Sequence, residues 1–104
     1  MPKSKRARAC DISAKVKKEV WERDNHCCII CGSHHAAPNS HYIKRSQMGL
    51  GIPENIGTMC LPCHIAYDQK EDQDVKKVFR EYLQSRHDGW DESKLTYEKY
   101  RWTL

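Results

Sequence analysis

Apolar residues recur at helical spacing in two stretches of the chain. In the first, Ile12, Val16 and Val20 lie four residues apart, and this spacing predicts a helix over residues 12–24. In the second, apolar positions three and four residues apart are typical of one face of an amphipathic helix over residues 74–85. Its apolar positions are Val75, Val78, Phe79, Tyr82 and Leu83. We therefore expect two helices on either side of a middle segment with a different pattern.

That middle segment predicts a β-hairpin followed by a third helix. Residues compatible with a strand run from Ala36 to Ile43, a glycine-containing loop follows over residues 44–54, and residues 56–59 are a short apolar run. A helix can then form over residues 62–69, because a proline is tolerated in the first turn of a helix. The hairpin and this helix are expected to form the centre of an α+β fold.

The two ends of the chain differ from this centre. Residues 1–11 show no periodicity and are expected to form a basic flexible arm. Residues 12–104 are predicted to be a single domain, in which residues 70–104 form a C-terminal helical extension. The tail after Gly89 is rich in aromatic residues, and we expect it to pack on the core. These residues are Trp90, Tyr97, Tyr100 and Trp102.

Composition limits the size of the core and the class of protein. The chain has 104 residues, of which 38% are apolar and 31% charged, so one small domain with a thin core is expected. Such a domain usually needs a metal or disulfides for stability. No run approaches the roughly 20 apolar residues of a membrane span, and the first ten residues lack the apolar stretch of a secretory signal. We expect a cytoplasmic protein in a reducing compartment.

Positive charge is concentrated at the start of the chain. Residues 1–18 contain seven basic residues and one acidic residue, although the net charge of the whole chain is only +4. Such a segment suits a polyanion, because each Lys or Arg placed on a phosphate releases condensed counterions. Nucleic acid is the predicted partner, and a solvated tail that serves solubility is the alternative. The arm residues expected to bind nucleic acid are Lys3, Lys5, Arg6 and Arg8.

Four of the six cysteines form two CxxC motifs, which predict a structural zinc site. Cys28 and Cys31 make one motif, and Cys60 and Cys63 make the other, so four thiolates can meet one tetrahedral ion. A redox motif and a pair of disulfides are the alternatives, but neither fits the expected compartment and pattern. The spacing leaves open whether Cys27 replaces Cys28. Cys10 has no partner in either motif and is expected to be a spare thiol.

The segments SHYIKRSQMGLGIPENIGTMC and LPCHIAYD carry several linked motifs. Over about residues 19–69 they resemble the HNH endonuclease family of ββα-metal nucleases. In that family a His ends the first hairpin strand, an Asn begins the second strand, and a His lies at the start of the following helix. His41, Asn55 and His64 occupy these places. The resemblance implies a zinc-stabilised hairpin and helix core with flanking helices, as in small HNH proteins of phages and prophages. It also implies a bacterial or phage-infected cell as the location.

The resemblance also implies a function, which is metal-dependent hydrolysis of DNA phosphodiester bonds by an endonuclease or nickase. His41 is the expected general base, because an imidazole with a pKa near 6.5 can accept a proton at physiological pH. Asn55 is expected to fix the loop that carries His41, through an amide that both donates and accepts. An alternative register makes His41 the metal ligand and places Tyr42 at the position of the base.

A catalytic divalent ion is expected at the same site, with Mg²⁺, Mn²⁺ or Ni²⁺ as candidates. His64 and Asp68 lie four residues apart, so on a helix they share a face and can bind one ion. The residue before the base is commonly Asp or His in the family, whereas here it is Ser40, whose neutral hydroxyl is a weak ligand. We therefore expect the ion to be completed by water or by the substrate phosphate.

Two basic residues beside the predicted base, Lys44 and Arg45, are expected to contact phosphate, with a solvated loop as the alternative. Two rival functions also follow from the sequence. Ser40 favours a catalytically silent zinc module that binds nucleic acid, and the aromatic tail favours an adaptor within a phage or defence assembly. One active site cuts one strand, so a double-strand break would need a homodimer or two events. No base-reading motif is present, and sequence preference is not predicted.

Overall fold

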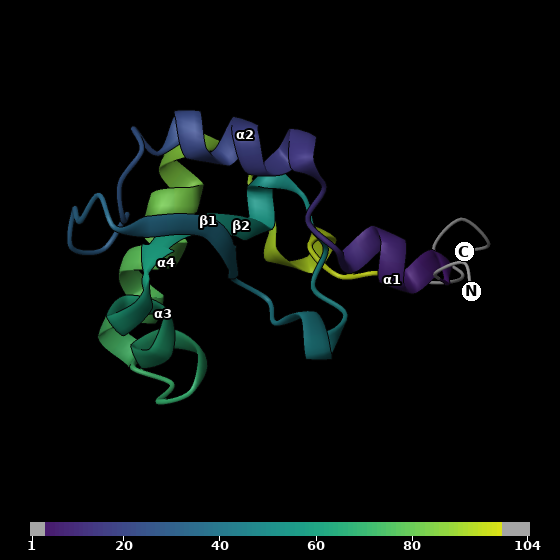
Figure 1. The fold of residues 1–104 in the computed structure, drawn as a ribbon. Helices are drawn as coiled ribbons and strands as arrows, with labels where there is room; N and C mark the ends of the chain where they lie inside the picture. Colours follow the sequence, from purple (N-terminus) through teal and green to yellow (C-terminus); the bar gives the residue numbers. More distant parts are fainter. Residues whose placement is uncertain (1–3, 99–104) are drawn as a thin grey trace.

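A two-stranded antiparallel sheet lies at the centre of the structure, a computed structural model that describes residues 4–98 (Figure 1). Strand β1 (Ala36–His41) pairs with β2 (Ile56–Cys60), with Ala36 opposite Cys60 and His41 opposite Ile56. The register shifts between Ala37 and Ser40, which marks an irregularity in β1 just before the predicted site. The hairpin predicted from the sequence is confirmed, and the long loop between its strands contains two short 3₁₀ helices, Arg45–Gln47 and Pro53–Asn55.

Three longer helices surround the hairpin. In the view of Figure 1, α2 (Ala14–Arg23) runs above the strands, α3 (Leu61–Asp68) lies below them, and α4 (Gln73–Arg86) passes behind. The three helices predicted from the sequence are thus confirmed, and their ends differ from the prediction by at most two residues. Their N-termini follow ordinary capping rules. The Ser13 hydroxyl accepts from the Val16 N–H at 3.1 Å, and the Asp72 carboxylate accepts from the Val75 N–H at 3.2 Å.

Residues 5–10 form a helix, α1 (Lys5–Cys10), where we expect an irregular arm from the sequence. Ser4 caps this helix, and the Gly51 N–H donates to the carbonyl of Ala9 at 2.9 Å. Cys10 at its end is buried, with 2% of its surface exposed. These residues thus contain a regular element that the sequence does not predict. A six-residue helix is too short to show a periodicity, and contacts with the distant hairpin loop stabilise it.

Aromatic residues dominate the small core. Phe79 of α4 is fully buried and lies edge-on against Tyr42 and Tyr67, with ring centroids 5.4 and 5.2 Å away. Gly57 of β2 makes this packing possible, because a Cβ atom there would lie 2.6 Å from the Phe79 ring. The hydroxyl of Tyr67 donates to the carbonyl of Tyr42, which fixes α3 against the end of β1.

The C-terminal segment packs on this core, as predicted for its first part. The indole N–H of Trp90 donates to the carbonyl of Glu54 at 2.7 Å, and Leu95 is 2% exposed. Between them, Glu92–Lys94 forms a short 3₁₀ helix within the predicted C-terminal extension. The predicted core residues Tyr100 and Trp102 lie outside the described residues. Within residues 4–98, no helix is long and apolar enough to span a membrane.

Candidate metal centre and hairpin site

The four cysteines of the two CxxC motifs converge on one point. The Sγ atoms of Cys28, Cys31, Cys60 and Cys63 all lie within 4.8 Å of one another. Zinc with Zn–S bonds of about 2.3 Å places its four sulfurs about 3.8 Å apart in a tetrahedron. The measured separation of the Cys31 and Cys60 sulfurs is 3.5 Å, close to that value. The donor set therefore fits a structural metal ion such as zinc.

Local structure explains how the cysteines meet. Cys28 and Cys31 lie in the turn that follows α2, which closes through hydrogen bonds from Gly32 N–H to Cys28 O and from Cys28 N–H to Ser33 O. Gly32 has a φ of +83°, a conformation that favours glycine. Cys60 ends β2 and Cys63 lies in the first turn of α3. The ion would thus join the loop after α2 to the junction of β2 and α3.

The electrostatics of the cluster also suit a cation. Burial raises the pKa of the Cys28 thiol, but hydrogen bonds at its sulfur, including those from the N–H groups of Cys31 and Ile30, outweigh this and lower the pKa to about 7. Burial and the neighbouring thiols raise the pKa of Cys60 and Cys63. Four thiolates can coexist here only when a positive ion balances them.

The structure also separates the two adjacent cysteines. Cys28 belongs to the cluster, whereas the Cys27 thiol donates to the carbonyl of Asp24 at 3.3 Å. Cys28 is therefore the fourth ligand candidate. All six cysteines lie within the described chain and are free, so the disulfide alternative has no support. Cys10 is separate from the cluster, as expected for a spare thiol, although it is buried.

At the opposite end of β1, Ser40 and His64 lie in direct contact. The Ser40 hydroxyl is fully buried and lies 2.7 Å from Nδ1 of His64, which projects from α3. The two residues predicted as ligands of a catalytic ion are thus adjacent. The predicted third ligand, Asp68, lies one turn further along α3, and its backbone carbonyl accepts from the Lys44 ammonium at 2.9 Å. Within residues 4–98, only the four cysteines form a group of three or more closely spaced His, Cys, Asp or Glu ligands.

His41 ends β1 with its ring held by the N-terminal segment. Nε2 of His41 lies 2.8 Å from the carbonyl oxygen of Cys10. A carbonyl only accepts, so the neutral ring carries its proton on Nε2 and its lone pair on Nδ1. Burial lowers the pKa of His41, and Arg45 lowers it further, although the Cys10 carbonyl opposes the shift. His41 is therefore a neutral imidazole with a fixed tautomer at neutral pH, as a general base requires.

Asn55 holds the loop between the strands. Its buried side chain accepts from the Ile43 N–H at 2.7 Å and donates to the carbonyls of Ile43 and Leu50 at 3.1 and 2.8 Å. Its own carbonyl accepts from the Tyr42 N–H at 2.7 Å. These bonds satisfy the amide and fix the chain immediately after His41. The sequence predicts such contacts between Asn55 and the loop.

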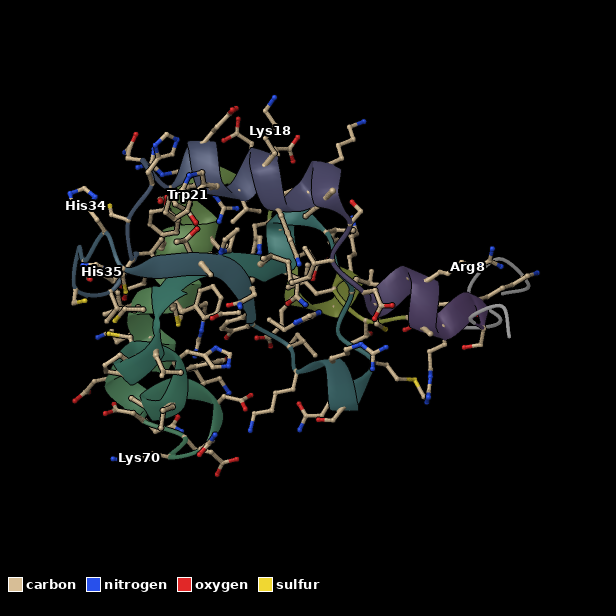
Figure 2. The ribbon with its side chains drawn as sticks, viewed as in Figure 1. Arg8, Lys18, Trp21, His34, His35 and Lys70 are labelled. Atoms are coloured by element: carbon tan, nitrogen blue, oxygen red, sulfur yellow. The ribbon has the colours of Figure 1, made fainter. Side chains whose placement is uncertain are left out.

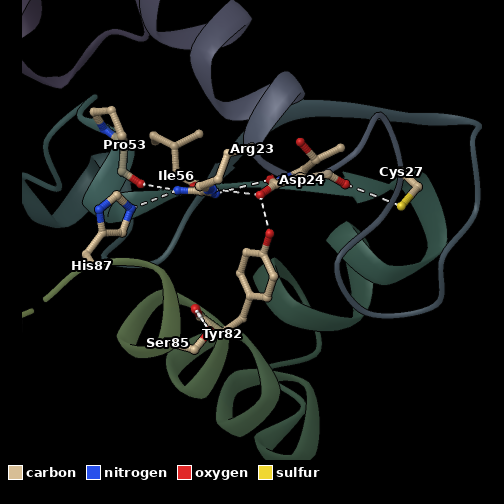
Figure 3. A network of polar contacts seen from close by, with 9 residues as sticks. Arg23, Asp24, Cys27, Pro53, Ile56, Tyr82, Ser85 and His87 are labelled. Atoms are coloured by element: carbon tan, nitrogen blue, oxygen red, sulfur yellow. Dashed lines mark hydrogen bonds and ion pairs between the residues drawn. The ribbon is translucent and has the colours of Figure 1, made fainter.

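A polar network anchors the start of β2 from behind (Figure 3). The guanidinium of Arg23 donates to the carbonyls of Pro53 and Ile56, both at 2.7 Å, and so holds the chain on both sides of Asn55. The adjacent Asp24 carboxylate is buried and accepts from Arg23, the Thr58 N–H and the Tyr82 hydroxyl. The sequence does not reveal this network, because Arg23 and Asp24 look like ordinary charged residues at a helix end.

The predicted nucleic-acid residues are dispersed. Lys5, Arg6 and Arg8 lie exposed on α1, and Figure 2 shows Arg8 pointing into solvent. Lys3 lies outside the described part of the chain. The two loop residues make internal contacts. Lys44 lies 3.6 Å from Glu71, and Nη2 of Arg45 lies 2.7 Å from the carboxylate of Asp11.

Comparison with known proteins gives no match. No family model matches this chain, and neither the curated proteins nor the solved structures contain a significantly similar protein. Assignment to a family therefore depends on the motif residues quoted above and on the geometry that they adopt.

Proposed function

We propose that this protein is a metal-dependent endonuclease or nickase of the HNH type, which hydrolyses DNA phosphodiester bonds. The observation that carries the proposal is the arrangement at the end of β1. His41 is a neutral imidazole of fixed tautomer, and Asn55 clamps the chain directly after it. Ser40 and His64 face each other from the adjacent strand position and from α3. The end of β1, the residue directly before β2 and the helix α3 thus supply the residues in the family order.

His41 acts on water. Its Nδ1 lone pair accepts a proton from a water molecule while the water oxygen attacks phosphorus. The bond between phosphorus and the 3′ oxygen of the sugar breaks, and this oxygen takes a proton from solvent water. By resemblance to the family, the products carry 5′-phosphate and 3′-hydroxyl ends. The Cys10 carbonyl keeps the ring from rotating and stabilises the imidazolium that forms.

The remaining residues of the site would bind the divalent ion and keep its ligands in position. His64 and Ser40, with Asp68 one turn along α3, would hold a divalent ion such as Mg²⁺, Mn²⁺ or Ni²⁺. When bound, this ion supplies positive charge that stabilises the developing charge on the phosphoryl and leaving oxygens. The four-cysteine cluster keeps α3 and β2 in register, so that His64 stays opposite Ser40.

Plasmid cleavage tests the proposal. Purified protein is incubated with supercoiled plasmid and Mg²⁺, Mn²⁺, Ni²⁺ or no metal, and nicked and linear products are measured. His41→Gln retains an N–H for the Cys10 carbonyl but has no base, so cleavage should fall by about 10²- to 10⁴-fold with folding intact. His34→Ala is the matched control, because His34 lies exposed on the loop before β1 (Figure 2). Equal activity of His41→Gln and wild type would refute the role of His41.

A second candidate is a catalytically silent zinc module that binds DNA. Ser40 favours it, because its neutral hydroxyl is a weak ligand and His64 belongs to no group of three closely spaced His, Cys, Asp or Glu ligands within the described residues. Absence of cleavage with every metal, combined with DNA binding, would support this candidate. Ser40→Asp then separates an impaired nuclease from a binding module. Gain of metal-dependent cleavage shows that only the ligand was missing, and continued inactivity assigns the protein to the silent class.

A further inference from the structure

A hollow of about 350 Å³ lies beside His41, on the side of the hairpin that faces the start of α2. Its walls come from four segments, namely the link between α1 and α2, the first turn of α2, the end of β1 and the 3₁₀ helix after it. The residues that line it are Asp11, Ile12, Lys17, Asn39, His41 and Arg45. Two cations, an amide and an imidazole thus surround a small space, and a single carboxylate also borders it.

The contacts of these groups indicate an anion-binding site, which the carboxylate of Asp11 occupies. Nε and Nη2 of Arg45 lie 2.8 and 2.7 Å from the same oxygen of Asp11. Both side chains remain partly exposed, at 52% for Arg45 and 30% for Asp11, so the pair can exchange for another anion. Lys17 is exposed and makes no ion pair with any residue between 4 and 98.

We propose that this hollow binds one backbone phosphate of DNA through Lys17 and Arg45, and that Asp11 competes with this phosphate for Arg45. The inference rests on the proposed function, since the phosphate would lie beside His41. Arg45 offers a planar pair of N–H donors that suits phosphate oxygens, and Lys17 adds a point charge from the other wall. The exposed amide of Asn39 in β1 also lines the hollow.

Lys17 and Lys18 provide a matched pair of variants. They are adjacent in α2 and carry the same charge, but Lys17 lines the hollow whereas Lys18 points away from the hairpin (Figure 2). Binding of a labelled twelve-base-pair duplex is measured by fluorescence anisotropy over a range of NaCl concentrations. Lys17→Gln should weaken binding and reduce the slope of log affinity against log salt by about 0.9, the value for one lost phosphate contact. Lys18→Gln should leave the slope unchanged.

Asp11→Asn tests the competition. It removes the carboxylate charge and should raise DNA affinity about two- to fivefold, the range of a partly exposed ion pair. Asp88→Asn makes the same change of net charge at an exposed site after α4 and should raise affinity less. If Asp11 acts through Arg45, the gain disappears in the Asp11→Asn, Arg45→Gln double variant, which a double-mutant cycle measures. Circular dichroism melts verify that all variants fold.

The outcomes separate this inference from the proposed nuclease activity, because the readout is binding and not cleavage. If wild type does not cut plasmid but Lys17→Gln alone reduces the salt slope, the phosphate site is supported and the nuclease proposal is not. If wild type cuts plasmid but Lys17→Gln and Lys18→Gln have equal slopes, the phosphate site is refuted. An equal effect of Asp11→Asn and Asp88→Asn refutes the competition.

Discussion

Asp24→Asn should destabilise the fold more than any other single charge removal within residues 4–98. The Asp24 side chain is fully buried and accepts from Nε and Nη2 of Arg23 at 2.7 and 3.1 Å. It also accepts from the Thr58 N–H at 2.9 Å and the Tyr82 hydroxyl at 2.6 Å. An asparagine of the same shape offers one acceptor oxygen, and its NH₂ group would face donors. Arg23 would then be left as a charge with only 13% of its side chain exposed.

The magnitude follows from the loss of one partner of a buried ion pair, which costs about 3–5 kcal/mol. A domain of this size has a total stability of about 5–15 kcal/mol, so the variant should lose a large part of it. Each kcal/mol lowers Tm by about 4 °C or more, which predicts a fall of at least about 12 °C. Tyr82→Phe removes one donor and leaves the ion pair intact, and it should cost about 1.5–3 kcal/mol.

Urea denaturation followed by far-ultraviolet circular dichroism measures both variants, with saturating zinc and at neutral pH. Asp88→Asn is the control for loss of an exposed carboxylate and should change stability little. A loss below about 1 kcal/mol for Asp24→Asn, or a larger loss for Tyr82→Phe, would show that the buried carboxylate does not organise the network.

Three further outcomes follow from the same contacts. Chelation of zinc, or Cys31→Ser, should unfold the hairpin, because metal binding supplies folding free energy in small thiolate domains; cooperative melting after verified zinc loss would contradict this. Stability should fall as the pH drops below about 6.5. The reason is His87, whose pKa in the folded state is lowered by burial and by Arg23, whose Nη1 lies 3.1 Å from Nε2 of His87. The unfolded state therefore binds the proton of His87 first as the pH falls. Urea midpoints of His87→Gln should depend less on pH over this range. Gly51→Ala should cost about 1–3 kcal/mol, since its Cβ would lie 2.1 Å from the Asp11 carbonyl oxygen; an unchanged urea midpoint would refute this close contact.

Local patterns in the sequence predict the elements of this fold well. The helices α2 and α4 follow from apolar spacing, and the hairpin follows from a strand-compatible segment and a short apolar run on either side of a glycine-containing loop. The cysteine cluster follows from the CxxC spacing alone, because two pairs of thiols near one tetrahedral site need little else. The choice of Cys28 over Cys27 needed the structure, since only the orientation of the turn decides which thiol points inward.

Contacts between distant segments could not be predicted in the same way. α1 forms because Gly51 and His41 bind the carbonyls of Ala9 and Cys10, and no local signal marks that pairing. The hollow beside His41 likewise combines Lys17, which looks like one solvated lysine among several, with residues more than twenty positions away. Periodicity reports which side of an element is buried, but it does not report which segment covers it.

The hairpin is fixed at both ends, and this explains how a sheet of two short strands can hold a precise site. At one end the Cys60 thiol belongs to the four-cysteine cluster, and at the other the Ile56 carbonyl accepts from Arg23. Between them, the Thr58 N–H donates to Asp24, so three alternate residues of β2 have partners outside the sheet. An isolated two-stranded hairpin is marginally stable in water. His41 pairs with Ile56 at the end held by Arg23, so its position depends on the buried ion pair as well as on the cysteine cluster.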